Sequence, residues 1–223
     1  DAYHHVKYDP FWEVCEDLGV IIHFHSGPAP HAEYFGDGFP AEDRRDEFPG
    51  AMGVFVSEVM WWLYRPLTFM IWGGVFERFP RLKVMIVEGG TMFMLPPWLR
   101  LLDFQYSEGD ISAKLGDFKS HLSMPPSGYF QRNIGIGASC VRRADIEARD
   151  EIGLEKIMWG SDFPHPEGTW PNTNQYYKDT FSGLPEQDGR KILGGNAVDF
   201  YGLDKSKLRA VADEIGPEAS LFN

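Results

Sequence analysis

The sequence has few cysteines, no long apolar run and a shortage of basic residues. Its 223 residues include two cysteines, Cys15 and Cys140, which stand far apart. This excludes a disulfide framework and is typical of a reducing compartment. Lysine and arginine together number 21 against 33 acidic residues, giving a formal net charge of −12. Such an acidic surface argues against binding to nucleic acid or to anionic membranes.

Targeting and membrane segments are also lacking. No apolar run reaches the roughly 18 to 20 residues that cross a bilayer, and no signal peptide is recognisable. We therefore expect a soluble cytoplasmic protein. The hydrophobic share of 43% is enough to bury one large core at this length. The chain begins with aspartate and not with methionine, so we also expect a processed form or a fragment.

Short apolar segments alternate with amphipathic ones along the chain. Strands are predicted at 20–27, at 81–90, around 134–136 and at 156–160. Helices are predicted at 10–18, 52–64, 66–79, 91–104, 144–152, 172–181, 185–193, 196–201 and 205–215. Repeated βα units of this kind predict a parallel sheet that is buried on both faces.

Four strands leave two architectures open for this α/β chain. One is a small open sheet. The other is an incomplete (β/α)8 TIM-barrel-like domain, the latter strands and helices of a barrel that needs about 250 residues. The missing methionine favours the second, so we expect residues 1–223 to form the C-terminal portion of a single barrel domain.

Two further expectations concern the helices and the first long connection. In the first helix, the spacing of Phe11, Val14, Cys15 and Leu18 predicts the buried face. Residues 28–50 are rich in proline, glycine and charge. Since long connections in compact domains are usually functional or disordered, we expect an active-site loop there, with a plain surface loop as the alternative.

Imidazole and carboxylate side chains stand where the predicted strands end. His23 and His25 alternate with other residues along the first strand, so they point to the same face and form a good arrangement for a metal. A core histidine bonded to the backbone is the alternative, above all for His23. Glu88 ends the second strand and precedes two glycines. It is either a site residue or an acid favoured by the dipole of the next helix.

Asp162 and His165 lie in a loop rich in proline and glycine that follows the last strand. In parallel α/β proteins, ligands bind at this edge of the sheet. Ordinary turn chemistry is the alternative, because aspartate and serine can satisfy their own backbone in a turn. The nearby side chains of Trp159, Phe163 and Trp170 suggest an apolar wall for a substrate.

Four segments carry a resemblance to a known family. They are 18–27 (LGVIIHFHSG), 76–90 with 95–103, 157–166 (IMWGSDFPHP) and 195–201 (GNAVDFY). From about residue 9 to 203 the chain resembles the amidohydrolase-related family, the aminocarboxymuconate-semialdehyde decarboxylase-like branch of the metal-dependent amidohydrolase superfamily. The resemblance implies a TIM barrel that holds one divalent metal ion, zinc in the first place and manganese as the alternative.

The resemblance also implies roles for individual residues. His25 and Asp162 would be metal ligands, with His23 and Glu88 as further candidates. Asp162 would alternatively accept a proton from metal-bound water, Glu88 would be a general base or hydrogen-bond acceptor, and His165 would orient Asp162 or hold the substrate. A metal-dependent hydrolase acting on a small organic, aromatic or cyclic substrate is the main expectation, and a non-oxidative decarboxylase is the alternative.

The chain departs from the family pattern at two places. Family members open with a strand bearing His-x-His, and nothing of that kind precedes His4. His23 and His25 could be that motif, but the helix before them favours the later strand. Many family decarboxylases also carry a histidine where Glu88 stands. A glutamate there can accept a proton or ligate a metal.

Two expectations from other classes stay open. The chain could be a catalytically incomplete barrel that is used for binding. It could also be a non-enzymatic subunit that binds a partner through the apolar run from Trp61 to Phe76. In the enzyme interpretation the same run makes a homodimer expected, because aromatic residues are enriched in interface cores.

Overall fold

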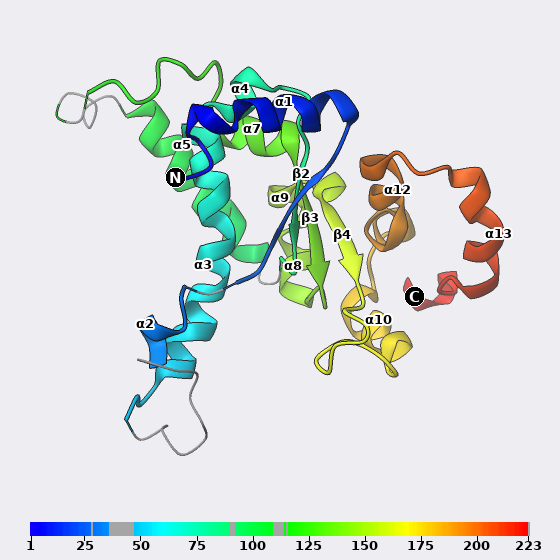
Figure 1. The fold of residues 1–223 in the computed structure, drawn as a ribbon. Coiled ribbons are helices and arrows are strands. Elements are labelled where there is room, and N and C mark those ends of the chain that lie inside the picture. Colours follow the sequence, from blue (N-terminus) through cyan, green and yellow to red (C-terminus); the bar gives the residue numbers. More distant parts are fainter. Residues whose placement is uncertain (28, 36–46, 90–91, 109–113, 115, 223) are drawn as a thin grey trace.

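A computed structural model of the chain describes residues 1–27, 29–35, 47–89, 92–108, 114 and 116–222. Its sheet contains four parallel strands in sequence order, namely β1 (Ile22–His25), β2 (Val84–Val87), β3 (Ile134–Ser139) and β4 (Ile157–Gly160). All four lie where strands were predicted (Figure 1). The α/β class is thereby confirmed, and the sheet agrees with part of a barrel.

Helices connect the strands. They are η1 (Val6–Tyr8), α1 (Asp9–Leu18), α2 (Ala32–Phe35), α3 (Ala51–Trp72), α4 (Val75–Arg78), η3 (Met92–Met94), α5 (Leu95–Ser107), α7 (Pro126–Asn133), α8 (Arg143–Glu147), α9 (Arg149–Ile152), η4 (Leu154–Lys156), α10 (Thr173–Phe181), α11 (Glu186–Arg190), the π-helical η5 (Lys191–Gly195), α12 (Asn196–Tyr201), α13 (Lys205–Ile215) and η6 (Ala219–Phe222). In Figure 1, α3, α5 and α7 lie on one side of the sheet, and α12 and α13 lie on the other.

The two faces of the sheet carry different side chains. One face packs into the core through alternate apolar residues of every strand, namely Ile22, Phe24, Val84, Ile86, Ile134, Ile136, Ala138, Ile157 and Trp159. Because side chains alternate along a strand, His23 and His25 project from the opposite face. There Gly135 allows Phe200 of α12 to approach, since a Cβ atom at this position would lie 2.9 Å from the ring.

The predicted buried face of the first helix is confirmed for Cys15 and wrong for Phe11, Val14 and Leu18. Trp12 and Cys15 are buried, whereas Phe11, Val14 and Leu18 are 53%, 54% and 73% exposed. The helix carries apolar side chains around much of its circumference. Contact with the core therefore selects the face that buries Trp12, the largest of them.

The predicted break between two helices near Pro66 is also wrong. Helix α3 continues through Pro66 and ends only at Gly73 and Gly74, where Gly74 has a φ of 66°. Proline removes one backbone donor from the turn, but α3 tolerates this loss because Leu67, Met70 and Ile71 on the following turns are fully buried. Helix α7 was not predicted, since its sequence has no strong apolar period.

The predicted active-site loop at 28–50 lies partly outside the described residues, which omit 28 and 36–46. Within the described part, α2 packs on the first half of α3. The hydroxyl group of Tyr34 there donates a hydrogen bond of 2.7 Å to Glu58. A role for 28–50 at an active site stays a prediction.

The apolar run from Trp61 to Phe76 serves mainly as core. Met70, Ile71, Val75 and Phe76 are fully buried, whereas Trp61 is 57% exposed. Among the helices of the described residues, none is both long and apolar enough to cross a membrane.

Candidate active site

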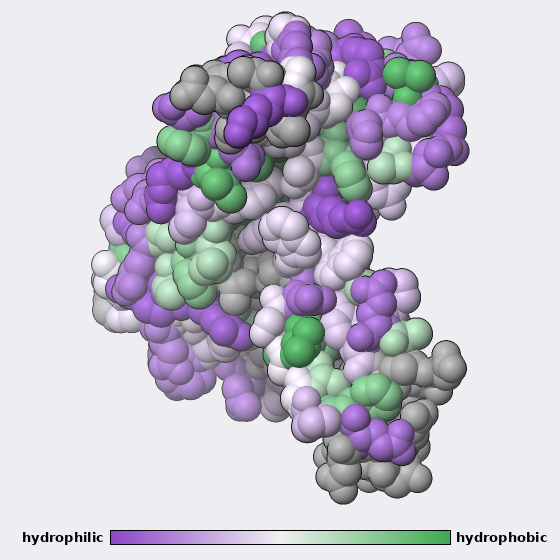
Figure 2. Space-filling view, turned by 90° about the vertical axis from the view of Figure 1, so that its left-hand side faces the viewer, coloured by the Kyte–Doolittle hydropathy of each residue, from purple (hydrophilic) through white to green (hydrophobic). Residues whose placement is uncertain are grey.

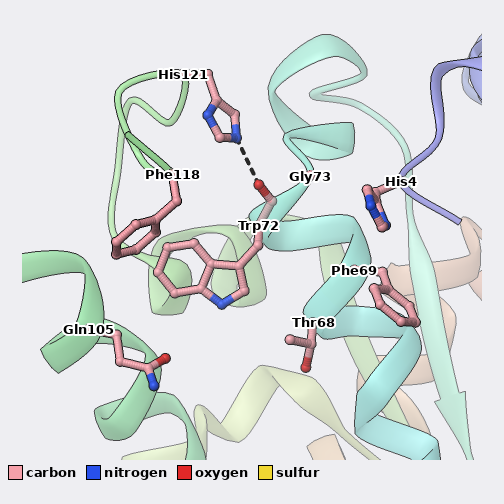
Figure 3. Close-up of a pocket in the computed structure, with 8 residues that line it drawn as sticks. All are labelled: His4, Thr68, Phe69, Trp72, Gly73, Gln105, Phe118 and His121. Atoms are coloured by element: carbon pink, nitrogen blue, oxygen red, sulfur yellow. Dashed lines mark hydrogen bonds between the residues drawn. The ribbon is translucent and has the colours of Figure 1, made fainter. Parts of the chain in front are cut away.

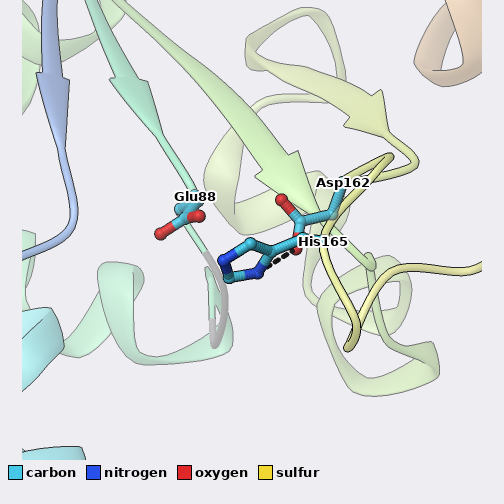
Figure 4. A group of neighbouring side chains, drawn as sticks. All are labelled: Glu88, Asp162 and His165. Atoms are coloured by element: carbon cyan, nitrogen blue, oxygen red, sulfur yellow. Dashed lines mark ion pairs between the residues drawn. The ribbon is translucent and has the colours of Figure 1, made fainter.

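Two carboxylates and one imidazole meet at the carboxyl end of the sheet. Glu88 directly follows β2, and Asp162 and His165 lie in the loop after β4. One ligand atom of each residue lies within 4.8 Å of those of the other two. Figure 4 shows the three side chains facing one another from these two segments. We call this group the strand-end site.

The backbone at this edge adopts an unusual conformation. Among the described residues, the non-glycine residues with positive φ are Glu88 at 53°, Cys140 at 53° and Asp162 at 62°. They follow β2, β3 and β4. A left-handed conformation costs a residue with a Cβ atom about 1–2 kcal/mol. Such residues cluster at functional sites, where the surrounding structure holds them in place.

The carboxylate of Glu88 is held by the end of β1 and the residue that follows it. The hydroxyl group of Ser26 donates a hydrogen bond to one carboxylate oxygen, and Nε2 of His25 lies 3.4 Å from the other. The Nδ1 atom of His25 donates to the carbonyl oxygen of Ser26 at 2.8 Å. The Nε2 atom of His25 is therefore the one that faces the site.

The imidazole of His165 contacts two carboxylates. Its Nδ1 atom lies 3.3 Å from Oδ2 of Asp162 and 2.8 Å from Oε1 of Glu167. The hydroxyl group of Ser139 donates to the other oxygen of Asp162 at 3.5 Å. A carboxylate at Nδ1 fixes the tautomer of an imidazole and leaves Nε2 available for a metal. Sequence reasoning missed Glu167, although the His-x-Glu spacing in one loop was a usable signal.

The structure separates the two histidines of β1. His25 contacts Glu88, whereas Nε2 of His23 lies 3.2 Å from the hydroxyl oxygen of Tyr201 in α12. Residues two apart on a strand are separated by about 6.6 Å, which places His23 below the strand-end site. The metal-ligand and catalytic roles assigned to His23, His25, Glu88, Asp162 and His165 stay predictions.

The last strand and the loop that carries Asp162 and His165 also carry the three aromatic residues expected to form a substrate wall. The rings of Phe163 and Trp170 are 63% and 68% exposed and pack edge to face at 5.8 Å. Trp159 differs, because it is partly buried against the core and packs on Tyr177 at 4.8 Å. Of the three expected wall residues, only Phe163 and Trp170 are therefore open to a ligand.

The Cys140 thiol lies beside the site but is not activated. Burial raises its pKa, and the negative charges of Asp162 and Glu167 raise it further. A thiol of this kind remains protonated at neutral pH and is a poor nucleophile.

The sequence of the chain is similar to a known protein family and to a curated protein. A family model described as amidohydrolase matches residues 1–203. The 2-amino-3-carboxymuconate-6-semialdehyde decarboxylase of Dictyostelium discoideum is 27% identical over 210 residues, which cover 89% of this chain and 49% of that protein. The chain thus spans about half the length of the curated relative.

Solved structures of decarboxylases share the fold of this chain. The crystal structure of 5-carboxyvanillate decarboxylase LigW from Sphingomonas paucimobilis has a TM-score of 0.64 and 25% identity, over 92% of this chain and 56% of that chain. A dihydroxybenzoic acid decarboxylase from Polaromonas sp. JS666, with bound manganese and 2-nitroresorcinol, has a TM-score of 0.63 and 21% identity, over 92% and 57%. The second likeness concerns the fold alone.

Proposed function

Because the chain belongs to the amidohydrolase family, we propose that its strand-end site serves the metal-dependent, non-oxidative decarboxylation of a small aromatic or cyclic carboxylate. The observation that carries this proposal is the convergence of Glu88, Asp162 and His165, in which the loop of Asp162 and His165 also carries an exposed aromatic pair. The curated relative and the 25% identical solved structure are both decarboxylases by name. This favours the decarboxylase alternative over the hydrolase that the sequence first suggested.

The donor set fits a divalent metal ion. Zinc bonds to nitrogen and oxygen ligands measure about 2.0–2.2 Å, so two ligand atoms of one ion lie at most about 4.4 Å apart. Small side-chain rotations bring ligand atoms that lie within 4.8 Å to this separation. Asp162, His165 and Glu88 would hold the ion, with His25 as a further donor. A bound ion would supply Lewis-acid polarisation of the substrate's oxygen atoms.

The identity of the ion is part of the proposal. Carboxylate ligands suit manganese, and imidazole suits zinc among other metals. The strand-end site offers both kinds of donor. We therefore propose manganese and zinc as equal candidates, and both are tested below.

Residues of the chain would supply the proton transfer and the contacts with the substrate ring. In decarboxylation, the bond between a ring carbon and the carboxyl carbon breaks, carbon dioxide leaves, and the ring carbon takes up one proton. We assign the transfer of this proton to Oδ2 of Asp162, which would take it from a water molecule and pass it to the ring carbon, leaving hydroxide; Nδ1 of His165, 3.3 Å away, would hold the carboxylate in place. Phe163 and Trp170 would flank the ring of the substrate and exclude water from it.

Hydrolysis is the second candidate function, and Glu88 favours it. Its carboxylate contacts the hydroxyl group of Ser26 and lies 3.4 Å from His25, so it is held in place as a base. A positioned carboxylate can take a proton from water as a general base. The two functions differ in their product, because only decarboxylation releases carbon dioxide.

The test is a product assay on the protein loaded with either manganese or zinc. Hydroxylated benzoates and unsaturated cyclic carboxylates are offered, together with lactones and esters of the same rings. We expect carbon dioxide to be released only from metal-loaded protein. Hydrolysis of lactones or esters without carbon dioxide would instead support the hydrolase, and binding without either product would support a barrel used for binding.

A homodimer is a further proposal. The first half of α3 projects from the body of the molecule and exposes Met52, Val54, Val56 and Trp61, each at least half exposed. Figure 2 shows hydrophobic side chains on this projecting part. Sedimentation equilibrium tests it: Trp61→Asp is expected to convert the dimer to a monomer, whereas Leu208→Asp on α13 leaves it unchanged. A monomeric native protein would contradict the proposal.

A further inference from the structure

A cavity of about 510 Å³ lies between α3, α5 and the segment that precedes α7. It lies at the carboxyl end of α3. The chain continues from there through α4 to the amino end of β2, so the cavity is far from the carboxyl ends of the strands. Its volume is within the range of about 300–1,000 Å³ that is typical of small-molecule sites. We call it the α3–α5 cavity.

Aromatic rings make up most of its walls. Phe69 and Trp72 come from α3, and Phe118 comes from the segment before α7. The rings of Trp72 and Phe118 pack edge to face at 5.5 Å. His4 stacks on Phe69 at 5.3 Å and closes one side. Walls of this kind favour a flat, aromatic ligand, because ring-to-ring contacts add to the burial of apolar surface.

Polar groups without partners face the same space. Among the described residues, neither the carboxamide of Gln105 nor the indole N–H of Trp72 makes a hydrogen bond, and both side chains are half-buried. Figure 3 shows the indole nitrogen directed toward the side of the cavity where Gln105 and Thr68 lie. A carboxamide offers a donor and an acceptor side by side.

Two other polar groups are already engaged and fix the walls. His121 donates from Nε2 to the carbonyl oxygen of Trp72 at 2.7 Å. Thr68 donates to the carbonyl oxygen of Tyr64 at 3.1 Å, which leaves its oxygen free to accept. No aspartate, glutamate, lysine or arginine lines the described cavity. A charged ligand would therefore meet no aspartate, glutamate, lysine or arginine among the lining residues, and it would lose part of its hydration there.

We propose that the α3–α5 cavity binds a neutral, planar heteroaromatic molecule of one or two rings that carries a hydrogen-bond donor and acceptor on adjacent atoms. The rings would lie among Phe69, Trp72 and Phe118. The donor and acceptor edge would pair with the carboxamide of Gln105. Nothing in this site depends on the strand-end residues.

Indazole, a neutral two-ring heteroaromatic compound with adjacent donor and acceptor nitrogens, is the probe, and calorimetric titration of the full chain is the measurement. We expect a Kd below about 1 mM, a value accessible to a ligand of this size. Thr68→Phe fills the cavity and is expected to abolish binding. Gln105→Leu removes the polar edge at nearly constant size and is expected to weaken binding about tenfold.

Three controls make the result decisive. Gln175→Leu makes the same change on the exposed surface of α10 and is expected to leave the Kd unchanged. Indazole-3-carboxylate adds a negative charge and is expected to bind at least about tenfold more weakly. Absence of indazole binding to the native chain would overturn the proposal. The proposal would also be overturned if Trp170→Ala raised the Kd for indazole and Thr68→Phe did not. Indazole would then occupy the strand-end site and not the α3–α5 cavity.

Discussion

The strand-end site and the α3–α5 cavity have opposite chemistry. The first gathers Glu88, Asp162 and His165, three ionisable groups on residues that follow strands. The second is walled by aromatic rings from α3 and from the segment before α7, and it has no acidic or basic residue other than histidine in its described lining. We have proposed a metal ion and a carboxylate substrate for the first and a neutral flat molecule for the second.

The difference shows how each kind of site follows from the chain. Parallel strands bring whatever residue follows them to one edge, so a strand-end site can be expected from topology. A cavity between helices depends on how Trp72, Gln105 and Phe118 pack across long stretches of sequence.

The largest expected effect is that of Asp162→Ala. It removes a carboxylate from the strand-end site, and we expect metal affinity to fall at least about 100-fold and turnover to be lost. Elemental analysis and the product assay measure the two effects. Asp179→Ala on the exposed side of α10 is the matched control. Unchanged metal content and turnover in Asp162→Ala would contradict the proposed function. We expect both variants to bind indazole as the native protein does.

Asp145→Ala tests whether a buried carboxylate stabilises the segments that follow β2 and β3. The Asp145 carboxylate is fully buried and accepts hydrogen bonds of 3.0 Å from the backbone N–H groups of Phe93 and Arg142. It thereby ties the segment after β2 to α8. Loss of both bonds is expected to lower the free energy of unfolding by about 2–4 kcal/mol in urea denaturation. Exposed Asp150→Ala should stay within about 0.5 kcal/mol of the native protein, and equal effects would contradict this account.

Removal of metal by a chelator should affect one region only. An ion present at about 100 times its Kd stabilises the folded state by about 2.7 kcal/mol. For a chain of this size, its loss lowers the Tm by about 5–10 °C. Differential scanning calorimetry measures the shift, and calorimetric titration should return the same Kd for indazole. A chelator that weakens indazole binding would show that the two regions are coupled.

The smallest effect concerns Glu77, which braces the segment that carries Phe118. Hydrogen bonds from Ser123 and Tyr129 lower the pKa of Glu77 below its ordinary value of 4.5. Because the pKa is lower in the folded state, the contribution to stability is present above pH 4.5 and is lost as the pH falls through the folded pKa.

The measurement for Glu77 is the urea midpoint as the pH is lowered from about 6 to about 3. We expect Glu77→Gln to flatten the acid side of this profile, because glutamine cannot be protonated in that range. Glu214→Gln on the exposed helix α13 controls for the lost charge. A profile for Glu77→Gln that matches the native one would contradict the assigned role of this carboxylate.

Local patterns were sufficient to predict the strands and the edge at which Glu88 and Asp162 meet. Short apolar segments followed by polar residues identify parallel strands, and topology then aligns their ends. The resemblance to the amidohydrolase family is confirmed by the family model. The partnership of His165 with Glu167 was not predicted: the His-x-Glu spacing made it available, but the path of a loop without regular structure decides which carboxylates the imidazole meets.

Tertiary contacts decided what the sequence left undetermined. The helix pattern of α1 allowed either Phe11 or Trp12 to be buried, and packing against the core selected Trp12. Pro66 signals a helix end by its chemistry, yet the buried residues after it keep α3 continuous. The α3–α5 cavity was not predicted, since no local pattern brings Gln105 to Trp72.

The left-handed backbone at Glu88, Cys140 and Asp162 has a consequence for sequence variation. Glycine adopts this conformation without strain. In a mutant library selected only for folding, glycine should be enriched at all three positions. Selection for turnover should eliminate it at 88 and 162, where it deletes a proposed site residue, and retain it at 140. The difference between the two selections would identify which residues at the carboxyl edge of the sheet are needed for turnover, before any natural substrate is known.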